Sequence, residues 1–471
     1  MAGLLGDLVN ASRALAAQQT GVQVAGRNIA NVNTPGYARQ RVILGERAVI
    51  ETATGPVGTG VEALGVKQIR DSFLDIQVTR ETSRSSYLTA QQEAFDKAES
   101  AMGEQIDRSQ DSAALGEAKG STTGLASSLN NFFVAFDSVA TSPGESALKQ
   151  VLLQKADSLV GKFNLADDRL VGLQTDLTAQ MTSESAKASS LLGQIAELNR
   201  QIAISEAGAP ESALALRDQR QSRLEELGQY LEFTTKAVPG SNGLIQINAK
   251  DAGGSDVLLV DGVDKMGDIA LNGTGFTGPG GVTLAINGGS LGGNLSARDG
   301  VIQKLRDDIK TTATSLASAV NAAYNPTGAT GDFFRVPPTS GLIQLDPTLT
   351  ASNLKTSDTG NSGANELALA VANLALKKFS TGSGDLIDGS IGGFYNKIVS
   401  GFGETIVGNE AKLGDQKIVA DMIARQRDSV SGVSLDEEVT DLMKFQRAYQ
   451  ASSRVISVID TMLESLINIG R

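Results

Sequence analysis

Two residue patterns in this chain could in principle carry chemistry, a glycine-rich loop and pairs of adjacent carboxylates. Gly273, Gly275 and Gly278 match the G-x-G-x-x-G spacing of dinucleotide-binding loops. That chemistry needs a helix directly after the loop, because the helix N-terminus holds the pyrophosphate. Pro279-Gly280 and a further glycine follow instead. We therefore interpret these glycines as turn residues.

The carboxylate pairs Asp167-Asp168 and Glu225-Glu226 could serve as acid and nucleophile in glycan hydrolysis. Both pairs fall on the polar faces of predicted helices, where solvated surface charge is the simpler interpretation. A hydrolase that cleaves cell-wall glycan is the alternative from a different functional class. We predict no catalytic residue, no cofactor and no metal site.

Composition excludes several kinds of chemistry. The chain has no His and no Cys, which removes imidazole acid–base catalysis, thiol nucleophiles and zinc–thiolate sites. A net charge of −12 argues against a nucleic-acid partner. No stretch is apolar for long enough to span a membrane. The first residues, from Met1 to Leu15, lack the cationic start of a secretory signal peptide, so we expect export, if any, without a cleaved leader.

The elements that must position any site are long helices, and the two ends of the chain carry the same heptad pattern. A strict seven-residue apolar repeat predicts a helix whose seam packs against another helix in a coiled coil. At the N-terminus the repeat is Leu8, Leu15, Val22 and Ile29. At the C-terminus it is Leu435, Leu442, Tyr449, Ile456 and Leu463, flanked by Phe445, Ile459 and Leu466.

These seam residues are the predicted assembly interface. The N-terminal helix is rich in Ala and Gln, so its contacts with a single partner helix are thin. A lone two-helix coil of this kind is marginal against the conformational entropy that it must overcome. We therefore expect the two ends to fray in the isolated chain and to become ordered against neighbouring copies.

Between the two ends, the pattern predicts a helical body with a β insert. Expected helices cover residues 3–32, 72–104, 125–139, 142–204, 212–231, 298–323, 365–378 and 391–429, followed by the C-terminal helix. Ser142 with Glu145 and Ser434 with Glu437 have the spacing of capping boxes. Short extended runs within 37–70 predict a hairpin or extended connector, and Pro35-Gly36 suits the centre of a type II turn.

Residues 238–300 differ in composition, since 16 of the 52 glycines fall there. Short β-prone runs at 244–247, 257–260, 269–271 and 282–286 are separated by turn dipeptides. Asp261-Gly262, Asn272-Gly273 and Asn287-Gly288 are typical of hairpin turns. Phe276 is the only aromatic residue of this segment, so its core must be light.

The fold class predicted is therefore mainly α with a small inserted Gly-rich β domain. We expect three domains: a terminal coiled coil (1–35 plus 432–471), a helical-bundle body (36–235 plus 297–431, with the β-hairpin connector near 37–70), and an outer β domain (236–296).

Two motifs resemble the bacterial flagellar axial proteins, which form the rod, hook and hook-associated layers. Residues 28–37, NIANVNTPGY, look like the ANxxTPGY signature of that superfamily, and its signature positions here are Ala30, Asn31, Thr34, Pro35, Gly36 and Tyr37. The continuation at 38–42 and the C-terminal segments 431–438, 445–452 and 454–457 resemble the hook-associated protein 1 (FlgK) family in particular. The long helical body also fits that family better than a hook or rod subunit.

The resemblance implies a structural adaptor, not an enzyme, at the junction of hook and filament, assembled as a layer on the hook tip that allows the filament to attach. Implied partners are further copies of the chain in a helical layer, hook protein on one side, the third hook-associated protein on the other, and a cytoplasmic export chaperone that binds the C-terminal region. The implied location is the extracellular flagellum, after a transient cytoplasmic stage and type III export. A hook or distal-rod subunit is the alternative within the superfamily.

Overall fold

The computed structural model describes residues 2–34, 36–46, 50–52, 55–57, 60–104, 124–241, 243–273, 275–328, 331–337, 341–359, 361 and 363–469. Signature residue Pro35 and the predicted strand residues Ala48 and Val49 lie outside these ranges. The chain forms two compact units. The first unit comprises 1–85, 185–289 and 416–471, and the second comprises 86–184 and 290–415.

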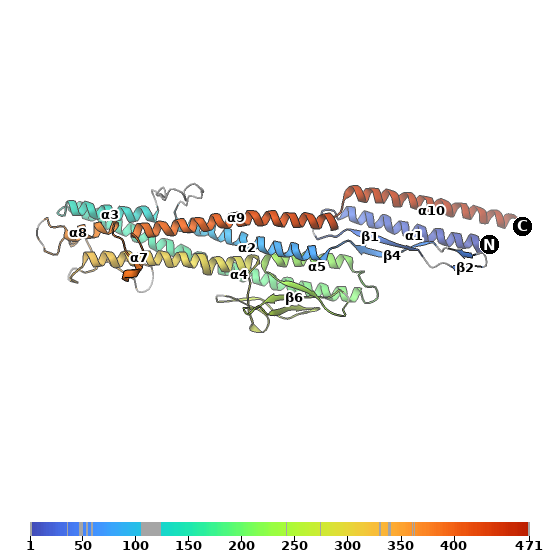
Figure 1. Cartoon of the computed structure of the whole chain (residues 1–471), viewed down its shortest axis with the longest axis horizontal. Helices are drawn as coiled ribbons and strands as arrows, with labels where there is room; N and C mark the ends of the chain where they lie inside the picture. Colours follow the sequence, from blue (N-terminus) through green and yellow to red (C-terminus); the bar gives the residue numbers. More distant parts are fainter. Residues whose placement is uncertain are drawn as a thin grey trace. The chain divides into compact units, whose positions relative to one another are not determined.

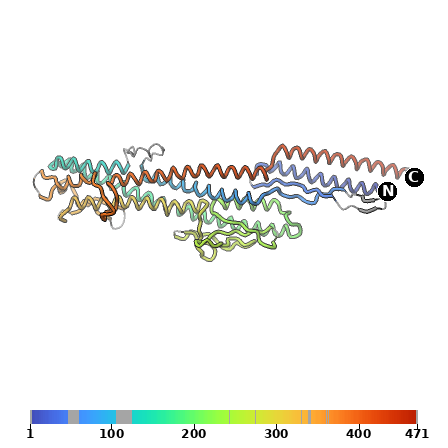
Figure 2. The backbone as a smooth tube through the Cα atoms, viewed as in Figure 1, coloured from blue at the N-terminus to red at the C-terminus, as the bar shows by residue number. Residues whose placement is uncertain are grey.

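The first unit contains both terminal helices, α1 (Ala2–Ala30) and α10 (Leu435–Ile469), which pack against each other (Figure 1). The helices run antiparallel, because Leu4 near the start of α1 and Met462 near the end of α10 line one groove. The tube in Figure 2 accordingly shows the blue start of the chain beside its red end. The predicted terminal helices are therefore confirmed.

The predicted connector is a pair of small hairpins in the first unit. Strand β1 (Gln40–Glu46) pairs antiparallel with β4 (Val61–Gln68), and β2 (Ile50–Thr52) pairs with β3 (Gly55–Val57). Val42 of β1 is buried, and both long strands contact α1. The connector is thereby fixed along the first terminal helix.

Further helical segments of the first unit support a β domain. They are the start of α2 (Ser72–Met102), the end of α4 (Ser146–Ser205), α5 (Leu214–Tyr230) and the end of α9 (Ile391–Ser431). One antiparallel sheet has the order β5-β6-β7-β8. Its strands are β5 (Thr234–Ala237), β6 (Ile245–Lys250), β7 (Asp256–Asp261) and β8 (Asp264–Lys265).

A second, three-stranded sheet has the order β11-β10-β9, with β9 (Ala270–Asn272), β10 (Gly275–Thr277) and β11 (Thr283–Leu284). Phe276 is fully buried in this sheet. It is the one aromatic side chain available to the light core that the sequence predicts. The glycines from Gly273 to Gly278 belong to a β-hairpin and its exit, with no helix of the dinucleotide-binding kind, so the turn interpretation is confirmed for the described residues.

One predicted hairpin turn is wrong. Asn287-Gly288 leads into helix α6 (Gly289–Ser296) instead of reversing a strand. Glycine is needed here because the chain passes close to its neighbours: a Cβ on Gly289 would lie 2.2 Å from the carbonyl carbon of Tyr230, and one on Gly288 would lie 2.6 Å from Ser83 Oγ. At Asn287-Gly288 the glycine therefore permits close packing and does not form a hairpin turn.

The second unit is a helical bundle with one continuous core. It contains α3 (Leu125–Thr141), the remaining residues of α2, α4 and α9, a π-helical turn (Ala297–Ile302), α7 (Gln303–Tyr324) and α8 (Glu366–Ala372). Strand β12 (Phe334–Arg335) pairs with β13 (Gln344–Leu345). Phe132, Phe136 and Phe333 are fully buried, with ring centroids of Phe136 and Phe333 5.2 Å apart.

The capping box predicted at Ser142 is wrong. Ser142 follows the last residue of α3 and its carbonyl accepts a hydrogen bond from Glu145 N–H, so these residues form a turn between α3 and α4. Helix α4 begins four residues later than predicted, at Ser146, because the chain has to reverse direction over Pro143-Gly144. At the other site, α10 does begin directly after Ser434, whose carbonyl accepts from Glu438 N–H at 3.0 Å.

The observed architecture is mainly α with a small β insert, as predicted from the sequence. The three-domain division stays a prediction. Among the described residues, none of the helices combines the length and apolar character that crossing a bilayer requires.

Candidate assembly interface

The seam between α1 and α10 is built from small residues on one side. A Cβ on Gly21 would lie only 2.6 Å from the Phe445 ring, so this ring packs directly on the α1 backbone. Asn28, one heptad further along, donates to Glu438 Oε2 at 2.9 Å, and Ala14, one heptad earlier, lines a groove with Val455. The residues of α1 that face α10 therefore follow the repeat 14, 21, 28.

The predicted interface residues of α1 lie one position away from this repeat. Leu8, Leu15, Val22 and Ile29 are half-buried on the flank of the α1 seam. On α10, Ile459 is buried in the seam. The half-buried residues of this helix include Leu442, Phe445, Ile456 and Leu463. Leu435, Tyr449 and Leu466 are exposed. The chain by itself thus covers only part of its apolar terminal surface.

A groove of about 700 Å³ runs along one side of the α1–α10 pair. Its α10 wall carries Val455, Val458 and Met462, all of which are at least half exposed. The groove continues as far as Leu466 near the end of the helix, opposite Leu4 of α1. The spacing of three and four residues places these side chains in one stripe along the edge of the seam. An apolar stripe of this length on a free surface is typical of an interaction site.

Tyr37 of the family signature takes part in a polar hub at the other end of the coil. Asn28 lies at its centre: its side-chain NH₂ donates to Gln40 O at 2.8 Å and to Glu438, while its Oδ1 accepts from Gln40 N–H and from Tyr37 Oη. Burial raises the pKa of Tyr37 to about 12, and nearby Asp218 adds to the effect. The phenol therefore stays a donor, and the hub joins α1, the connector and α10.

The other signature residues shape the turn that delivers Tyr37 to this hub. Tyr37 N–H donates to Thr34 O at 3.2 Å and Gly36 has φ = +77°, as the predicted type II turn requires. Asn31 closes the end of α1 by donating to Arg27 O, and Thr34 Oγ1 donates to Asn31. Ala30 is exposed at the last helical position.

Arg39 extends the hub along the start of α10. Its Nε lies 2.6 Å from Glu438 Oε1, and its other nitrogens approach Glu437 and Asp441. Burial opposes the charge of Arg39, but the bonds to Glu437 and Glu438 outweigh it and raise its pKa. Glu437, which the capping-box prediction assigned to the backbone of α10, thus holds Arg39 of the connector.

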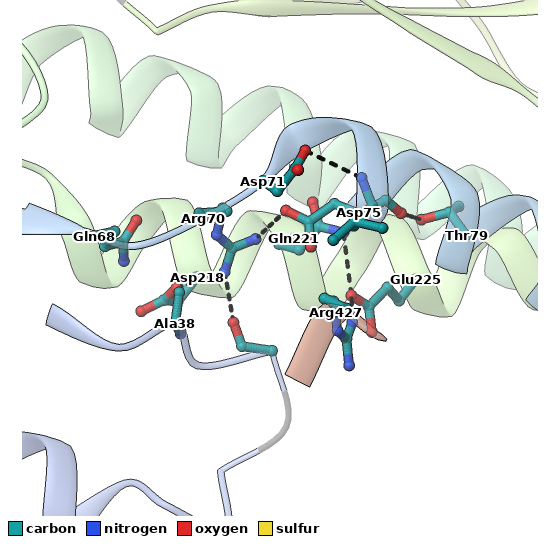
Figure 3. A network of polar contacts seen from close by, with 12 residues as sticks. Ala38, Gln68, Arg70, Asp71, Asp75, Thr79, Asp218, Gln221, Glu225 and Arg427 are labelled. Carbon is teal, nitrogen blue, oxygen red and sulfur yellow. Dashed lines mark hydrogen bonds and ion pairs between the residues drawn. The ribbon is translucent and has the colours of Figure 1, made fainter. Parts of the chain in front are cut away.

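A second polar cluster ties the connector to helices α2 and α5 (Figure 3). Arg70 donates to Gly36 O and to Asp218 Oδ1, each at 2.7 Å, and to Asp75 Oδ2 at 3.0 Å. Asp218 also accepts from Ala38 N–H at 3.3 Å. Burial raises the pKa of Asp218 to about 6, although Arg70 partly offsets the effect. The cluster therefore carries a carboxylate that is costly to ionise.

The carboxylate pairs considered for catalysis have structural partners. Glu225 lies 2.7 Å from Arg427 of α9, and Glu226 pairs with Arg223 on its own helix. Asp167 lies 2.9 Å from Arg306, and Asp168 is exposed. Within the described ranges, no three acidic side chains gather closely enough to hold a metal ion. The polar residues of this chain are arranged for joining helices.

Sequence reasoning missed Asn28, Arg39 and Arg70 as functional residues. The signals for Asn28 were its place at the start of the segment 28–37 and its heptad spacing from Ala14 and Gly21. Arg39 and Arg70 find their partners 399 and 148 residues away, which no local pattern records.

Comparisons with protein families agree with this geometry. Residues 8–37 match the family model of the flagella basal body rod protein, and residues 424–469 match the C-terminal model of the flagellar basal body rod FlgEFG proteins. Both matches fall on the two helices that form the coil and on the polar hub. The two ends of the chain therefore resemble those of the flagellar axial proteins.

The central part of the chain resembles one family among these proteins. Residues 117–333 match the helical domain of flagellar hook-associated protein FlgK. Flagellar hook-associated protein 1 of Bacillus subtilis (strain 168) is 26% identical over 98% of this chain and 97% of its own length. Its counterpart in Escherichia coli (strain K12) is 24% identical over 98% and 99%. Over nearly its full length, the chain is therefore similar to the flagellar hook-associated protein 1 family.

A solved structure is also similar to this chain. It is the flagellar hook junction protein FlgK from Burkholderia pseudomallei, at 22% identity and a TM-score of 0.42. The match covers 56% of this chain and 47% of that protein.

Proposed function

We propose that this chain is a structural adaptor at the junction of the bacterial flagellar hook and filament. It assembles as a layer on the hook tip, and that layer allows the filament to be attached. The observation that carries the proposal is the order of the family matches. Rod-type segments occupy only the two ends, and a hook-associated helical domain fills residues 117–333 between them. A hook or distal-rod subunit, the alternative, would not be expected to contain that domain.

The proposed mechanism uses the surface that the single chain leaves uncovered. In the layer, the predicted interface residues of α1 and α10 and the stripe around Val458 pack against the terminal helices of neighbouring copies. Contacts of this kind are heterologous, so they continue around the layer from one copy to the next. Burying a large apolar side chain contributes roughly 1.5–3 kcal/mol. Several such side chains per copy are enough to order helices that are marginal alone.

The polar hub has a positioning role in this proposal. Asn28, Tyr37 and Arg39 fix the start of α10 against the end of α1, so that both helices present their apolar stripes in one register. The work of the protein is then assembly and needs no catalysis. The layer contacts hook protein on one face and the third hook-associated protein on the other.

The route to that location is part of the proposal. The chain leaves the cytoplasm through the flagellar type III export channel, held beforehand by an export chaperone at its C-terminal region. Exposed apolar side chains towards the end of α10, among them Val455, Val458, Met462 and Leu466, supply a surface for such a chaperone. The final location is the extracellular flagellum.

Deleting the gene and restoring it with variants tests the proposal. We expect cells without the gene to make complete hooks, to lack filaments and to shed flagellin into the medium. Wild-type protein should restore filaments, and a Val458→Asp, Met462→Asp double variant should not. The matched control is Val151→Asp, an exposed valine on α4, which should restore them fully. Filaments of normal number in the deletion strain would contradict the proposal, and hooks of altered length or an absent rod would favour the hook or rod alternative.

A further inference from the structure

One face of α2 in the first unit carries an uncovered apolar and basic surface. Phe73, Ile76, Arg80 and Arg84 follow one another at three- and four-residue spacing, so they share a face of the helix. Phe73 is 64% exposed and is the only phenylalanine among the large exposed side chains of the described chain. Exposed aromatic and arginine side chains are the types that dominate binding energy at protein interfaces.

A hollow of about 380 Å³ opens beside this face. Ile76, Leu224 and Phe233 give it apolar walls, and Arg80 and Arg84 stand at its edge. Two acidic residues also line it. Asp75 is buried against Arg70, while Glu232 is exposed. Arg84 is paired with Glu81 on its own helix. The hollow thus suits an apolar side chain that carries negative charge beside it.

The second unit presents such a side chain on a rigid loop. Leu386 is 56% exposed, and the next residue, Ile387, is buried and anchors the loop. Two backbone hydrogen bonds between Phe379 and Gly389 close the loop at its base. Asp385 accepts from Ser380 N–H at 3.0 Å, and Asp388 accepts from Thr381 N–H at 2.8 Å. These bonds hold Leu386 between two carboxylates without a large entropic cost on binding.

We propose that this loop of one copy docks on the α2 face of a second copy in the assembled layer. Leu386 enters the hollow beside Phe73 and Ile76, and Asp385 and Asp388 lie opposite Arg80 and Arg84. Charge favours this occupant, because Asp385 and Asp388 flank the apolar side chain and the exposed Arg80 stands at the edge of the hollow, where Asp75 is already paired with Arg70. The inference rests on the proposed function, since that function brings copies side by side. It adds a contact outside the terminal helices.

Introduced cysteines test this contact cleanly, because the chain has no Cys of its own. Ile76→Cys and Leu386→Cys variants are mixed, assembled on hooks isolated from cells that lack the protein, and oxidised. We expect a disulfide-linked dimer that contains one copy of each variant. The matched control pairs Ile76→Cys with Leu376→Cys, another second-unit leucine with an 86% exposed side chain. The control should give at most one-tenth of the dimer.

The outcomes separate this inference from the proposed function. Layers that form on hooks without dimer above the control level overturn the docking contact alone. Failure of the wild-type chain to cap hooks overturns the proposed function and the docking contact with it. A cross-link from Ile76→Cys to another flagellar protein would also overturn the inference.

A second pair of variants tests the charge component. Arg80→Glu with Arg84→Glu should lower the dimer yield at least tenfold, whereas Arg80→Lys with Arg84→Lys should retain most of it. Circular dichroism of each variant verifies that the helices are intact. An unchanged yield after charge reversal would overturn the proposed pairing of the arginines with Asp385 and Asp388.

Discussion

The terminal coil of the first unit and the core of the second unit hold helices together in opposite ways. In the second unit, Phe333 packs against four other rings, those of Phe132, Phe136, Tyr324 and Phe334. In the coil, the buried side of α1 is supplied mostly by small residues such as Ala17, Gly21 and Ala25, and the larger apolar residues at its flank are only half-buried. The first arrangement stabilises a chain alone. The terminal coil keeps much of its apolar surface exposed, where neighbouring copies can pack against it.

The largest loss of stability is expected from a substitution in the aromatic core of the second unit. Phe333→Ala removes a fully buried ring, and substitutions of this kind cost about 3–5 kcal/mol. Chemical denaturation followed by circular dichroism should show the second unit unfolding at much lower denaturant. The control is Phe73→Ala, which removes an exposed ring and should change stability by less than about 0.5 kcal/mol. Equal effects of the two variants would refute the assignment of the core.

The polar hub should give the next largest effect. Asn28→Ala leaves Gln40 N–H and Tyr37 Oη without their acceptor, and each unsatisfied buried group costs about 1–3 kcal/mol. We expect proteolysis to release α1 faster than in the wild type while the second unit stays intact. Asn31→Ala, which removes two exposed bonds, one to Arg27 O and one from Thr34 Oγ1, is the matched control. Unchanged cleavage of Asn28→Ala would show that the hub does not position the coil.

The polar cluster around Arg70 and Asp218 should make the stability of the first unit depend on pH. Burial raises the pKa of Asp218 in the folded chain to about 6, above its ordinary value of 3.8. The folded state therefore binds more protons than the unfolded state between these values, and stability falls as the pH rises through this window. The loss above pH 6 is about 2–3 kcal/mol.

Asp218→Asn removes this titration and keeps a side-chain oxygen for Ala38 N–H. We expect the stability of the wild type relative to Asp218→Asn to fall steadily from pH 4 to pH 6 in urea titrations. A constant difference across that range would mean that the Asp218 carboxyl titrates normally.

We expect the smallest effect from alanine substitutions at two glycines of α1, Gly21 and Gly26. Gly21→Ala forces the Phe445 ring away from α1, whereas a methyl group on Gly26 would meet no atom within 4 Å. Alanine favours a helix by about 1 kcal/mol over glycine. Gly26→Ala should therefore raise the helical content of the isolated chain, and Gly21→Ala should weaken pairing of the two terminal helices. Identical behaviour of the two variants would place Phe445 elsewhere.

The sequence was sufficient for the long helices, the β insert and the family signature, because heptads, turn dipeptides and a contiguous motif are local signals. It did not provide the register of the coil, since a search for large apolar residues passes over Gly21, whose importance comes from Phe445. Nor did it reveal the core role of Phe333 and Phe334, which lie in an irregular segment. The turn at Ser142 misled prediction because a turn and a helix cap use the same residue types.

We infer that neighbouring copies order the terminal helices, and amide hydrogen exchange measures this order along each helix. In dilute solution, α1 and α10 should exchange quickly while α3 and α7 in the second unit stay protected. In layers assembled on hooks, the same two helices should gain protection of about 100-fold. Terminal helices that are as protected as α3 and α7 in the isolated chain would contradict the account.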